Sequence, residues 1–216
     1  MRLPLRHFYD PRLADEEGLV GLTPAITPGL LLEAYQNGIF PWSDRPARWY
    51  SPDPRSIFDL ETLKLSRRLV RVVRQGRFQV TFDRAFAQVM QACRAHHHRY
   101  SWLSPTMVAA YTHFHQLGYA HSVEVWFEEE LVGGLYGVGM GKFFAGESMF
   151  FRHTDASKVA FYHLVVKLRQ LGVQLFDSQV INSHTASLGA IEISREDYLK
   201  RLELALGVEP SVQVWV

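Results

Sequence analysis

The chain has 216 residues, of which 47% are hydrophobic and 21% charged, a composition typical of soluble globular proteins rather than disordered ones. Its 23 lysines and arginines nearly balance its 22 aspartates and glutamates, so the net charge of +1 gives no indication of a nucleic-acid or membrane partner. The single cysteine, Cys93, excludes an intrachain disulfide and a multi-cysteine metal site. We therefore expect a cytoplasmic protein without a membrane segment, and a monomer, because no heptad or large apolar stripe is left over.

Eight of the ten prolines lie within the first 54 residues, which sets this region apart from the rest of the chain. Residues 40–54 combine prolines with aromatic residues, so we expect this segment to form neither a regular helix nor a central strand. The composition changes near residue 56. We therefore predict a small N-terminal domain at residues 1–56 and a larger domain at residues 57–216.

Helix start and stop signals are clear along the chain. A side-chain cap opens and a glycine closes each of four segments, which run from Thr27 to Gly38, Ser104 to Gly118, Thr154 to Gly172 and Ser194 to Gly207. We expect Asp83 to cap a further helix that reaches about Ala95.

Strand signals fall between these helices. Residues 78–82 alternate between apolar and polar side chains, and residues 122–126 and 131–138 flank an acidic turn as in a hairpin. Residues 142–147 and 173–180 are further strand candidates. A hairpin followed by strands that a capped helix separates predicts an α+β fold with a mixed β-sheet flanked by helices, not a doubly wound parallel sheet.

A basic run stands out against the neutral average. Between Thr62 and Phe82 there are six positively charged residues and no acid. Arg67, Arg71 and Arg74 stand at positions i, i+4 and i+7, so a helix would align them on one face while its leucines and valines turn toward the core. Like charges at this spacing repel, which indicates an anionic partner such as phosphate groups. A solvated basic face is the alternative that spacing alone leaves open.

The glycine-rich segment 132–141 resembles a phosphate-binding loop only superficially. Such loops lie at a turn from a strand to a helix, whereas this segment lies inside the predicted hairpin and no Gly-Lys-Ser/Thr sequence follows. Glycine within a strand is more typical of a bulge or of a close backbone approach.

Polar side chains on two predicted strands are candidates for a functional site. Asp177 and Gln179 stand two residues apart on an otherwise apolar strand, so both point to one face. Buried polar groups need partners, so the pair serves a polar site or is satisfied structurally, for example by the loop 182–185. Glu147, at the end of another strand, poses the same question.

Other candidates are weaker. The run 96–98 of three histidines favours a solvated loop over a metal site, because adjacent histidines converge poorly on one ion. Cys93 stands at a core-facing position of its helix, which favours a buried structural thiol over a nucleophile. Trp42, Trp49 and Tyr50 belong either to the core or to a surface for base stacking.

Several strings together resemble one family, the leucyl/phenylalanyl-tRNA–protein transferases. They occur in the family's order, span about residues 30 to 200, and are specific as a set: LEAYQNGIFPW (32–42), WYSPDPR (49–55), HSVEVW (121–126), ELVGGLYGV (130–138), GESMF (146–150), DASK (155–158), and DSQV (177–180) with HTASLGA (184–190).

The resemblance implies a small N-terminal domain followed by an acyltransferase domain of the GNAT type. It also implies transfer of leucine or phenylalanine, with methionine left open, from aminoacyl-tRNA to the α-amine of proteins that begin with Arg or Lys. This reaction creates a degradation signal of the N-end rule. The implied reaction is ester aminolysis that requires no cofactor, metal or covalent intermediate.

The resemblance also implies roles for individual residues. Asp177 and Gln179 correspond to the catalytic pair, and Glu147 to a glutamate on the acceptor side. We hypothesise that Gln179 accepts a hydrogen bond from the attacking amine, and that Asp177 polarises it or receives the proton. The remaining matches are Tyr35, Trp42, Trp102 and Tyr111 for the aminoacyl-adenosine, Leu135, Phe144 and Met149 for the amino-acid pocket, and Arg67, Arg71 and Arg74 for tRNA phosphates.

The chain departs from the family pattern in three places. Residues 23–28 replace a Gly-Gly-Asp-Leu-Ser-Pro turn, Ser178 stands where many relatives have cysteine, and Leu135 stands where methionine can occur, which leaves the donor preference open. Two other functions compete with the family reading. A GNAT acetyltransferase would need a glycine-containing pyrophosphate loop, which residues 151–158 lack, and a non-catalytic RNA-binding protein would leave Asp177, Gln179 and Glu147 without a role.

Overall fold

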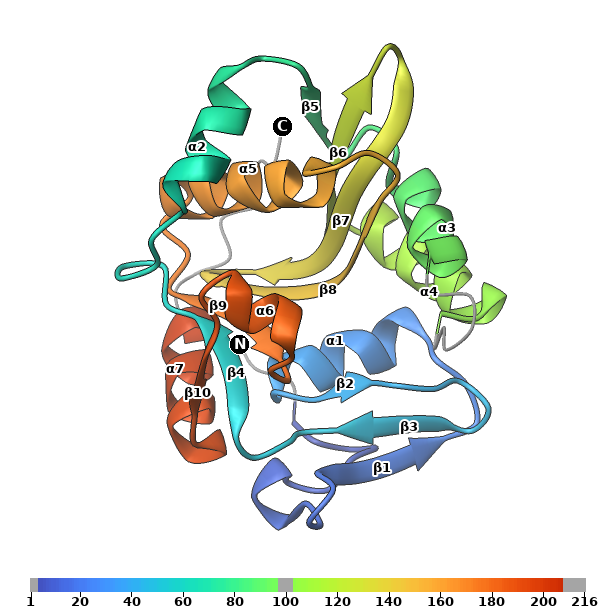
Figure 1. Ribbon diagram of the computed structural model, residues 1–216. Helices are drawn as coiled ribbons and strands as arrows, with labels where there is room; N and C mark the ends of the chain where they lie inside the picture. Colours follow the sequence, from blue (N-terminus) through green and yellow to red (C-terminus); the bar gives the residue numbers. More distant parts are fainter. Residues whose placement is uncertain (1–3, 97–102, 208–216) are drawn as a thin grey trace.

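The computed structural model describes residues 4–96 and 103–207, and Figure 1 shows their arrangement as a small sheet beside a large one. A short 3-10 helix, η1 (Pro11–Leu13), precedes the small sheet of β1 (Leu19–Thr23), β3 (Ala47–Tyr50) and β2 (Phe40–Pro41), in the order β1-β3-β2. Helix α1 (Pro28–Gln36) connects β1 to β2.

The expectation that residues 40–54 contain no central strand is wrong, because β3 is the middle strand of the small sheet. The prolines stand where they interrupt no ladder. Pro41 lies on the edge strand β2, and Pro46 directly precedes β3. The amides within β3 therefore remain free to pair with both neighbours.

The large sheet has seven strands in the order β10-β4-β9-β8-β7-β6-β5. Neighbouring strands are antiparallel except β8 and β9, which are parallel, so the predicted mixed sheet is confirmed. The strands are β4 (Arg55–Phe58), β5 (Gln79–Phe82), β6 (Ala120–Phe127), β7 (Glu130–Met140), β8 (Phe143–Phe151), β9 (Leu175–Gln179) and β10 (Ile191–Ile193). The sequence predicted five of them and missed β4 and β10.

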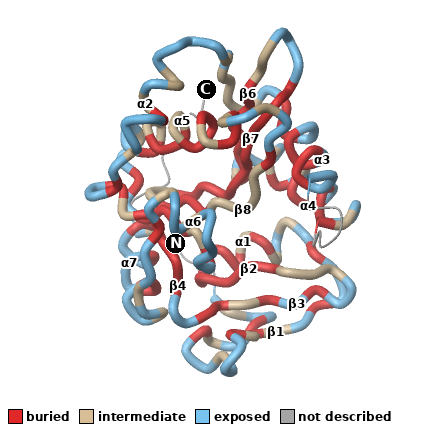
Figure 2. Tube along the Cα trace, viewed as in Figure 1, coloured by how far each residue is buried: buried red, intermediate tan, exposed pale blue. Residues whose placement is uncertain are grey.

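Helices cover both faces of the large sheet, which confirms the α+β class. Helix α5 (Ala156–Gln170) packs on one face, and α2 (Arg67–Arg74) packs against α5. On the other face lie α3 (Phe86–His96), α4 (Pro105–Gln116) and α7 (Arg195–Gly207), and α1 contacts α4. Figure 2 shows β7 as largely buried and α5 and β8 as buried in part, whereas the tip of the β6–β7 hairpin is exposed.

The predicted helix starts are confirmed, with two corrections at the caps. The side chains of Thr27, Ser104 and Ser194 accept hydrogen bonds from backbone amides of the first helical turn, as expected. Asp155 precedes α5 in a left-handed conformation and makes no side-chain cap bond. Asp83 does not cap α3, because its carboxylate binds the ring of His121 and the amide of Ser122.

The glycines of β7 permit close packing, as expected for glycine in a strand. A Cβ atom on Gly137 would lie 2.2 Å from the carbonyl oxygen of Ala145, and one on Gly133 would lie 2.5 Å from Cβ of Ala156. The first contact is with the neighbouring strand and the second with the start of α5. These glycines therefore bring β8 and α5 close to β7 and do not form a phosphate loop.

The parallel pairing of β8 with β9 is short, and this creates the space for a site. Phe143 to Ala145 pair with Leu175 to Asp177, and beyond that point β8 continues to Phe151 while β9 ends at Gln179. Residues of both strands beyond the paired segment line one cavity. The division of the chain at residue 56 falls within β4 and stays a prediction.

Candidate active site

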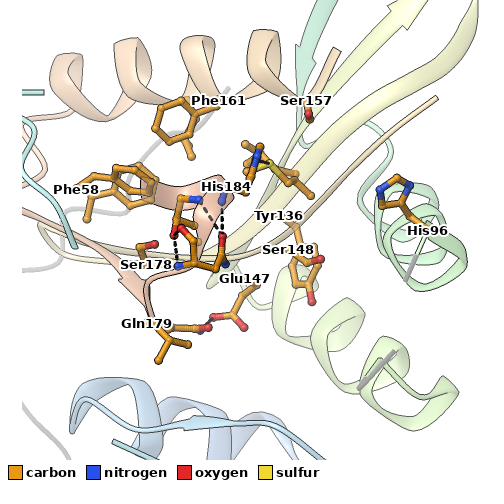
Figure 3. A pocket seen from close by; sticks show the side chains of 18 of the residues that line it. Phe58, His96, Tyr136, Glu147, Ser148, Ser157, Phe161, Ser178, Gln179 and His184 are labelled. Atoms are coloured by element: carbon orange, nitrogen blue, oxygen red, sulfur yellow. Dashed lines mark hydrogen bonds between the residues drawn. The ribbon is translucent and has the colours of Figure 1, made fainter. Parts of the chain in front are cut away.

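A cavity of about 650 Å³ opens between the separating ends of β8 and β9 (Figure 3). Helix α5 and the short helix α6 (Ser183–Ser187), which the sequence did not predict, supply further walls. Asn182 caps α6 by accepting hydrogen bonds from the amides of His184 and Thr185. The loop 182–185 therefore organises α6. The alternative that this loop supplies the hydrogen-bond partners of Asp177 and Gln179 is wrong, because their partners come from other elements.

One end of the cavity is apolar. Leu135 and Met149, two of the three predicted pocket residues, line it together with Phe161 and Phe176. The third, Phe144, is fully buried behind this wall, where its ring packs edge-on against Phe176 at 5.7 Å between ring centres. The apolar end therefore has the character needed to hold a hydrophobic side chain.

The polar wall of the cavity depends on a buried ion pair that the sequence did not reveal. Asp177 is fully buried, and its carboxylate forms a bidentate pair with Arg55 at 2.9 Å from Nε and 2.6 Å from Nη2. The hydroxyl of Tyr198, on α7, donates to the same carboxylate at 2.9 Å. Asp177 and Arg55 are 122 positions apart, so no local spacing signals this pair. The only available indication was that a buried carboxylate needs a cation.

Gln179 connects this ion pair to the cavity. Its backbone amide donates to Oδ1 of Asp177 at 2.8 Å, and its side-chain Nε2 donates to Oε1 of Glu147 at 2.7 Å. The backbone of Gln179 is left-handed, with φ at +64°, which is unusual for a residue other than glycine. Because the side-chain nitrogen Nε2 faces Glu147, the side-chain oxygen Oε1 of Gln179 is left to accept a hydrogen bond from a molecule in the cavity.

Glu147 lies on the cavity wall above buried tyrosines. The Tyr111 hydroxyl lies 3.5 Å from Oε2 of Glu147 and 2.6 Å from the Tyr35 hydroxyl. Desolvation raises the pKa of Glu147 to about 8, and the negative charge of Asp177 acts in the same direction. A hydrogen bond from Tyr35 and the positive charge of Arg55 offset part of this increase in pKa. At neutral pH the carboxyl group is therefore mostly protonated.

The predicted aromatic residues occupy different environments. Trp42 lines the cavity, and its ring contacts that of Tyr50 at 4.8 Å between centres. Tyr35 and Tyr111 are buried beneath Glu147, so they reach the cavity through that carboxyl group. Trp102 lies outside the described residues. The assignment of these four residues to aminoacyl-adenosine binding stays a prediction.

Trp49 and Cys93 belong to the core. Trp49 is fully buried and donates from Nε1 to the Thr23 hydroxyl at 2.8 Å. Cys93 is also fully buried, and desolvation raises the pKa of its thiol to about 12, as expected for a structural cysteine. His96 lines the cavity near Phe151, while the other two histidines of the run lie outside the described residues. Within residues 4–96 and 103–207, no cluster of three or more His, Cys, Asp or Glu could hold a metal ion.

The basic run forms a helix, as predicted, although α2 is confined to Arg67–Arg74. Arg67, Arg71 and Arg74 are exposed, and with Leu65 and Val70 they line a second hollow of about 400 Å³. Leu69 is buried, and Val72 and Val73 pack against the same apolar cluster, to which α5 contributes. The three arginines thus form one exposed basic surface, whose binding to tRNA stays a prediction.

Comparison with known proteins matches most of the chain to one family. A family model described as leucyl/phenylalanyl-tRNA protein transferase matches residues 57–203, and the N-terminal domain model of the same family matches residues 25–53. The chain belongs to the leucyl/phenylalanyl-tRNA–protein transferase family. It is therefore an aminoacyltransferase.

Relatives support the same assignment over most of their length. The leucyl/phenylalanyl-tRNA–protein transferase of Syntrophobacter fumaroxidans is 51% identical over 195 residues, which cover 88% of this chain and 83% of the relative. That of Cellvibrio japonicus is 48% identical over 90% of this chain and 86% of the relative, and that of Shigella sonnei is 45% identical over 94% and 88%.

Similarity to solved structures is much weaker. The C-terminal domain of a putative lysylphosphatidylglycerol synthetase from Agrobacterium fabrum is 14% identical, with a TM-score of 0.42 over 88% of this chain and 62% of that one. This similarity is too low to assign the GNAT type, which stays a prediction. No helix in the described part of the chain has the length and apolar character needed to cross a membrane.

Proposed function

We propose that this aminoacyltransferase moves leucine or phenylalanine from the 3′ end of an aminoacyl-tRNA to the α-amine of proteins that begin with Arg or Lys. The product would carry a degradation signal of the N-end rule in the cytoplasm. The observation that carries the proposal is a single cavity with an apolar end beside Leu135 and Met149 and a polar wall at Gln179 and Glu147. An apolar aminoacyl side chain and a cationic acceptor would occupy opposite ends.

Transfer of the amino acid from the ester to the amine needs neither a strong base nor a nucleophile from the protein. In an aminoacyl ester the carbonyl carbon is already activated, and an α-amine with a pKa of about 7.7–8.0 is substantially neutral near pH 7.5. The amine nitrogen attacks the ester carbon, the new C–N bond forms, and the ester C–O bond breaks. The released ribose hydroxyl takes up a proton, while the amine loses one. Positioning of the two substrates is the main contribution that the site has to make.

Gln179 would position the amine. Its side-chain nitrogen is engaged by Glu147 at 2.7 Å, so its carbonyl oxygen can accept a hydrogen bond from the N–H of the incoming α-amine. That bond would direct the nitrogen lone pair toward the ester carbon. Gln179 does not need to act as a strong base, because the amine is neutral when it attacks.

Glu147 would select the acceptor. A cationic first residue of the acceptor favours the ionised form of a nearby carboxyl group, so binding of Arg or Lys would lower the raised pKa of Glu147. The resulting charge pair forms in a partly desolvated site, where an attraction between opposite charges is stronger than in water. An acceptor without a cationic side chain would leave Glu147 protonated and gain nothing from it.

The donor would extend from the apolar end of the cavity toward α2. Leu135 and Met149 would contact the leucine or phenylalanine side chain, with Phe144 supporting the wall from behind. Trp42, on the cavity wall, offers an aromatic face for the terminal adenine. Arg67, Arg71 and Arg74 offer positive charge for phosphates of the tRNA acceptor stem.

The proposal is tested by incubating the protein with Leu-tRNA that carries radiolabelled leucine and with a peptide that begins with Arg. We expect label on the peptide. Peptides of the same sequence that begin with acetylated Arg or with Glu serve as controls and should remain unlabelled. Binding of the tRNA without transfer to any peptide would favour a non-catalytic RNA-binding protein, and turnover of acetyl-CoA would favour an acetyltransferase; either result contradicts the proposal.

A further inference from the structure

We propose that Arg55 and Tyr198 are positioning residues, which act through Asp177 to hold Gln179 in its left-handed backbone conformation with its side chain on the cavity wall. In this arrangement Asp177 is a structural anion and not the proton acceptor of the reaction. The inference deepens the proposed function and rests on it for its kinetic consequences. Its structural part can be measured independently of activity.

The carboxylate of Asp177 has no free position from which to take up a proton from a substrate. Oδ1 accepts hydrogen bonds from Nε of Arg55 and from the backbone amide of Gln179, at 2.9 and 2.8 Å. Oδ2 accepts from Nη2 of Arg55 and from the Tyr198 hydroxyl, at 2.6 and 2.9 Å. Each oxygen therefore already accepts two hydrogen bonds from groups of the protein itself. Asp177 is also fully buried and does not line the cavity.

Arg55 is itself held on several sides, which makes the ion pair rigid. Its Nη1 donates to the carbonyl oxygen of Gly38 at 3.1 Å, and its guanidinium lies 4.7 Å from the ring centre of Phe40 and 4.3 Å from that of Tyr198. Gly38 follows the C-cap residue of α1, Phe40 belongs to β2, and Tyr198 belongs to α7. Arg55 thus connects the N-terminal sheet, β9 and the last helix at one point.

The consequence of this anchoring falls on Gln179. A residue other than glycine at φ of +64° is strained, and it keeps this conformation only when its surroundings fix it. The bond from the Gln179 amide to Asp177 Oδ1 supplies that restraint at the end of β9. Without it, the backbone of Gln179 would relax, and its side chain would lose its alignment with Glu147.

Two conservative variants test the proposal. Tyr198→Phe removes one hydrogen bond to Asp177 and keeps the ring beside Arg55. Arg55→Lys keeps the positive charge but removes the planar bidentate contact. We expect each variant to lower kcat for an Arg-initiated peptide roughly tenfold or more while KM for Leu-tRNA stays within about twofold. Val20→Ala, a truncation at a fully buried site in β1, is the control for general loss of stability and should leave kcat unchanged.

A double-mutant cycle separates positioning from a merely structural role. In a Gln179→Ala background, Tyr198→Phe should have no further effect on kcat, because the side chain that it positions is absent. Multiplication of the two effects, or an unchanged kcat in both single variants, would overturn the inference. The second readout is hydrogen exchange at the Gln179 amide, which we expect to accelerate in Tyr198→Phe and not in Val20→Ala.

The two proposals can fail separately. If the unmodified protein transfers no amino acid to any peptide, the proposed function fails, and amide exchange at Gln179 still decides whether Arg55 and Tyr198 hold it. If the unmodified protein is active but exchange at the Gln179 amide is the same in Tyr198→Phe and Val20→Ala, the positioning role is refuted and the proposed function stands.

Discussion

Nε2 of Gln179 donates a hydrogen bond of 2.7 Å to Oε1 of Glu147. This bond connects the residue proposed to hold the attacking amine, Gln179, to the residue proposed to bind the cationic side chain of the acceptor, Glu147. The two residues come from β9 and β8, beyond the last positions at which these two strands pair with each other. Where the strands separate, side chains from both can contact the same substrate. The site is therefore a consequence of the short parallel pairing.

The affinity for a cationic acceptor should rise with pH. The pKa of Glu147 is raised to about 8, so below this pH the group is mostly neutral and a bound Arg must first displace its proton. We expect Kd for an Arg-initiated peptide to fall between pH 6 and pH 8 and then to level off. Calorimetry at each pH, in two buffers of different ionisation enthalpy, should also detect release of a proton on binding.

The Glu147→Gln protein is the control for this dependence. It keeps a polar side chain of similar size but cannot ionise, so the part of the pH dependence caused by Glu147 should disappear and the released proton with it. An unchanged dependence in this variant would assign the titration to the peptide α-amine and remove Glu147 from acceptor selection.

The tyrosines beneath Glu147 should tune this titration. The hydrogen bond from Tyr35 lowers the pKa of Glu147, so Tyr35→Phe should move the pKa further above 8 and shift the rise in acceptor affinity to higher pH. Removal of this hydroxyl also leaves the Tyr111 hydroxyl without its 2.6 Å partner, at a cost of about 1–3 kcal/mol in the free energy of unfolding. Chemical denaturation measures the second effect, and the midpoint of the affinity profile measures the first. A midpoint that moves down would contradict the proposed hydrogen bond.

The longer helices of this chain were predictable because their signals are local, whereas the short helices η1 and α6 were missed. Thr27 and Ser104 cap helices whose first turns directly follow them, and the structure has both caps. The hairpin of β6 and β7 was predictable for the same reason, since its strands flank a two-residue turn. Asp83 misled the prediction because a helix cap and a bond to a neighbouring strand look alike in the sequence; its carboxylate binds His121, 38 positions away.

The candidate site was only partly predictable. Period two predicted that Asp177 and Gln179 point to one face of a strand, whereas in the structure Gln179 lines the cavity and Asp177 is buried away from it. The resemblance to the family supplied their roles. Neither could reveal that Arg55 pairs with Asp177, because the pairing between β4 and β9 depends on how the whole sheet is ordered. Nor could the sequence show that the Asp177 carboxylate is fully engaged by hydrogen bonds within the protein. For this reason the role proposed for Asp177 changes from accepting a proton to anchoring Gln179.

The apolar end of the cavity should set the preference between donors. Met149 lines it and its sulfur contacts Nε2 of His184 at 3.1 Å, so Met149→Ala would enlarge the space available to the donor side chain. We expect the ratio of kcat/KM for Phe-tRNA to that for Leu-tRNA to increase by about tenfold, since a few methylene groups in an apolar pocket discriminate by this order. Competition between the two charged tRNAs for one peptide measures the ratio. Leu22→Ala, at an exposed position of the small sheet, is the matched control, and a ratio unchanged in both variants would place the donor side chain elsewhere.

The exposed arginines of α2 should determine how tRNA binding depends on salt. Arg67, Arg71 and Arg74 share one face of an eight-residue helix, and no acidic residue lines the hollow that they form. Each phosphate contact that is lost should reduce the slope of log K against log salt by about 1 unit, so the triple substitution to Gln should weaken binding and flatten the slope by up to about 3 units. Filter binding of tRNA at salt concentrations from about 50 to about 300 mM measures both the affinity and the slope.

Lys200→Gln on α7 is the control. It removes an exposed charge that is already paired with Glu196 and Asp197, so it should leave the slope unchanged. Equal slopes for the triple variant and the unmodified protein would make the basic face of α2 a solvated surface and require the tRNA to bind elsewhere.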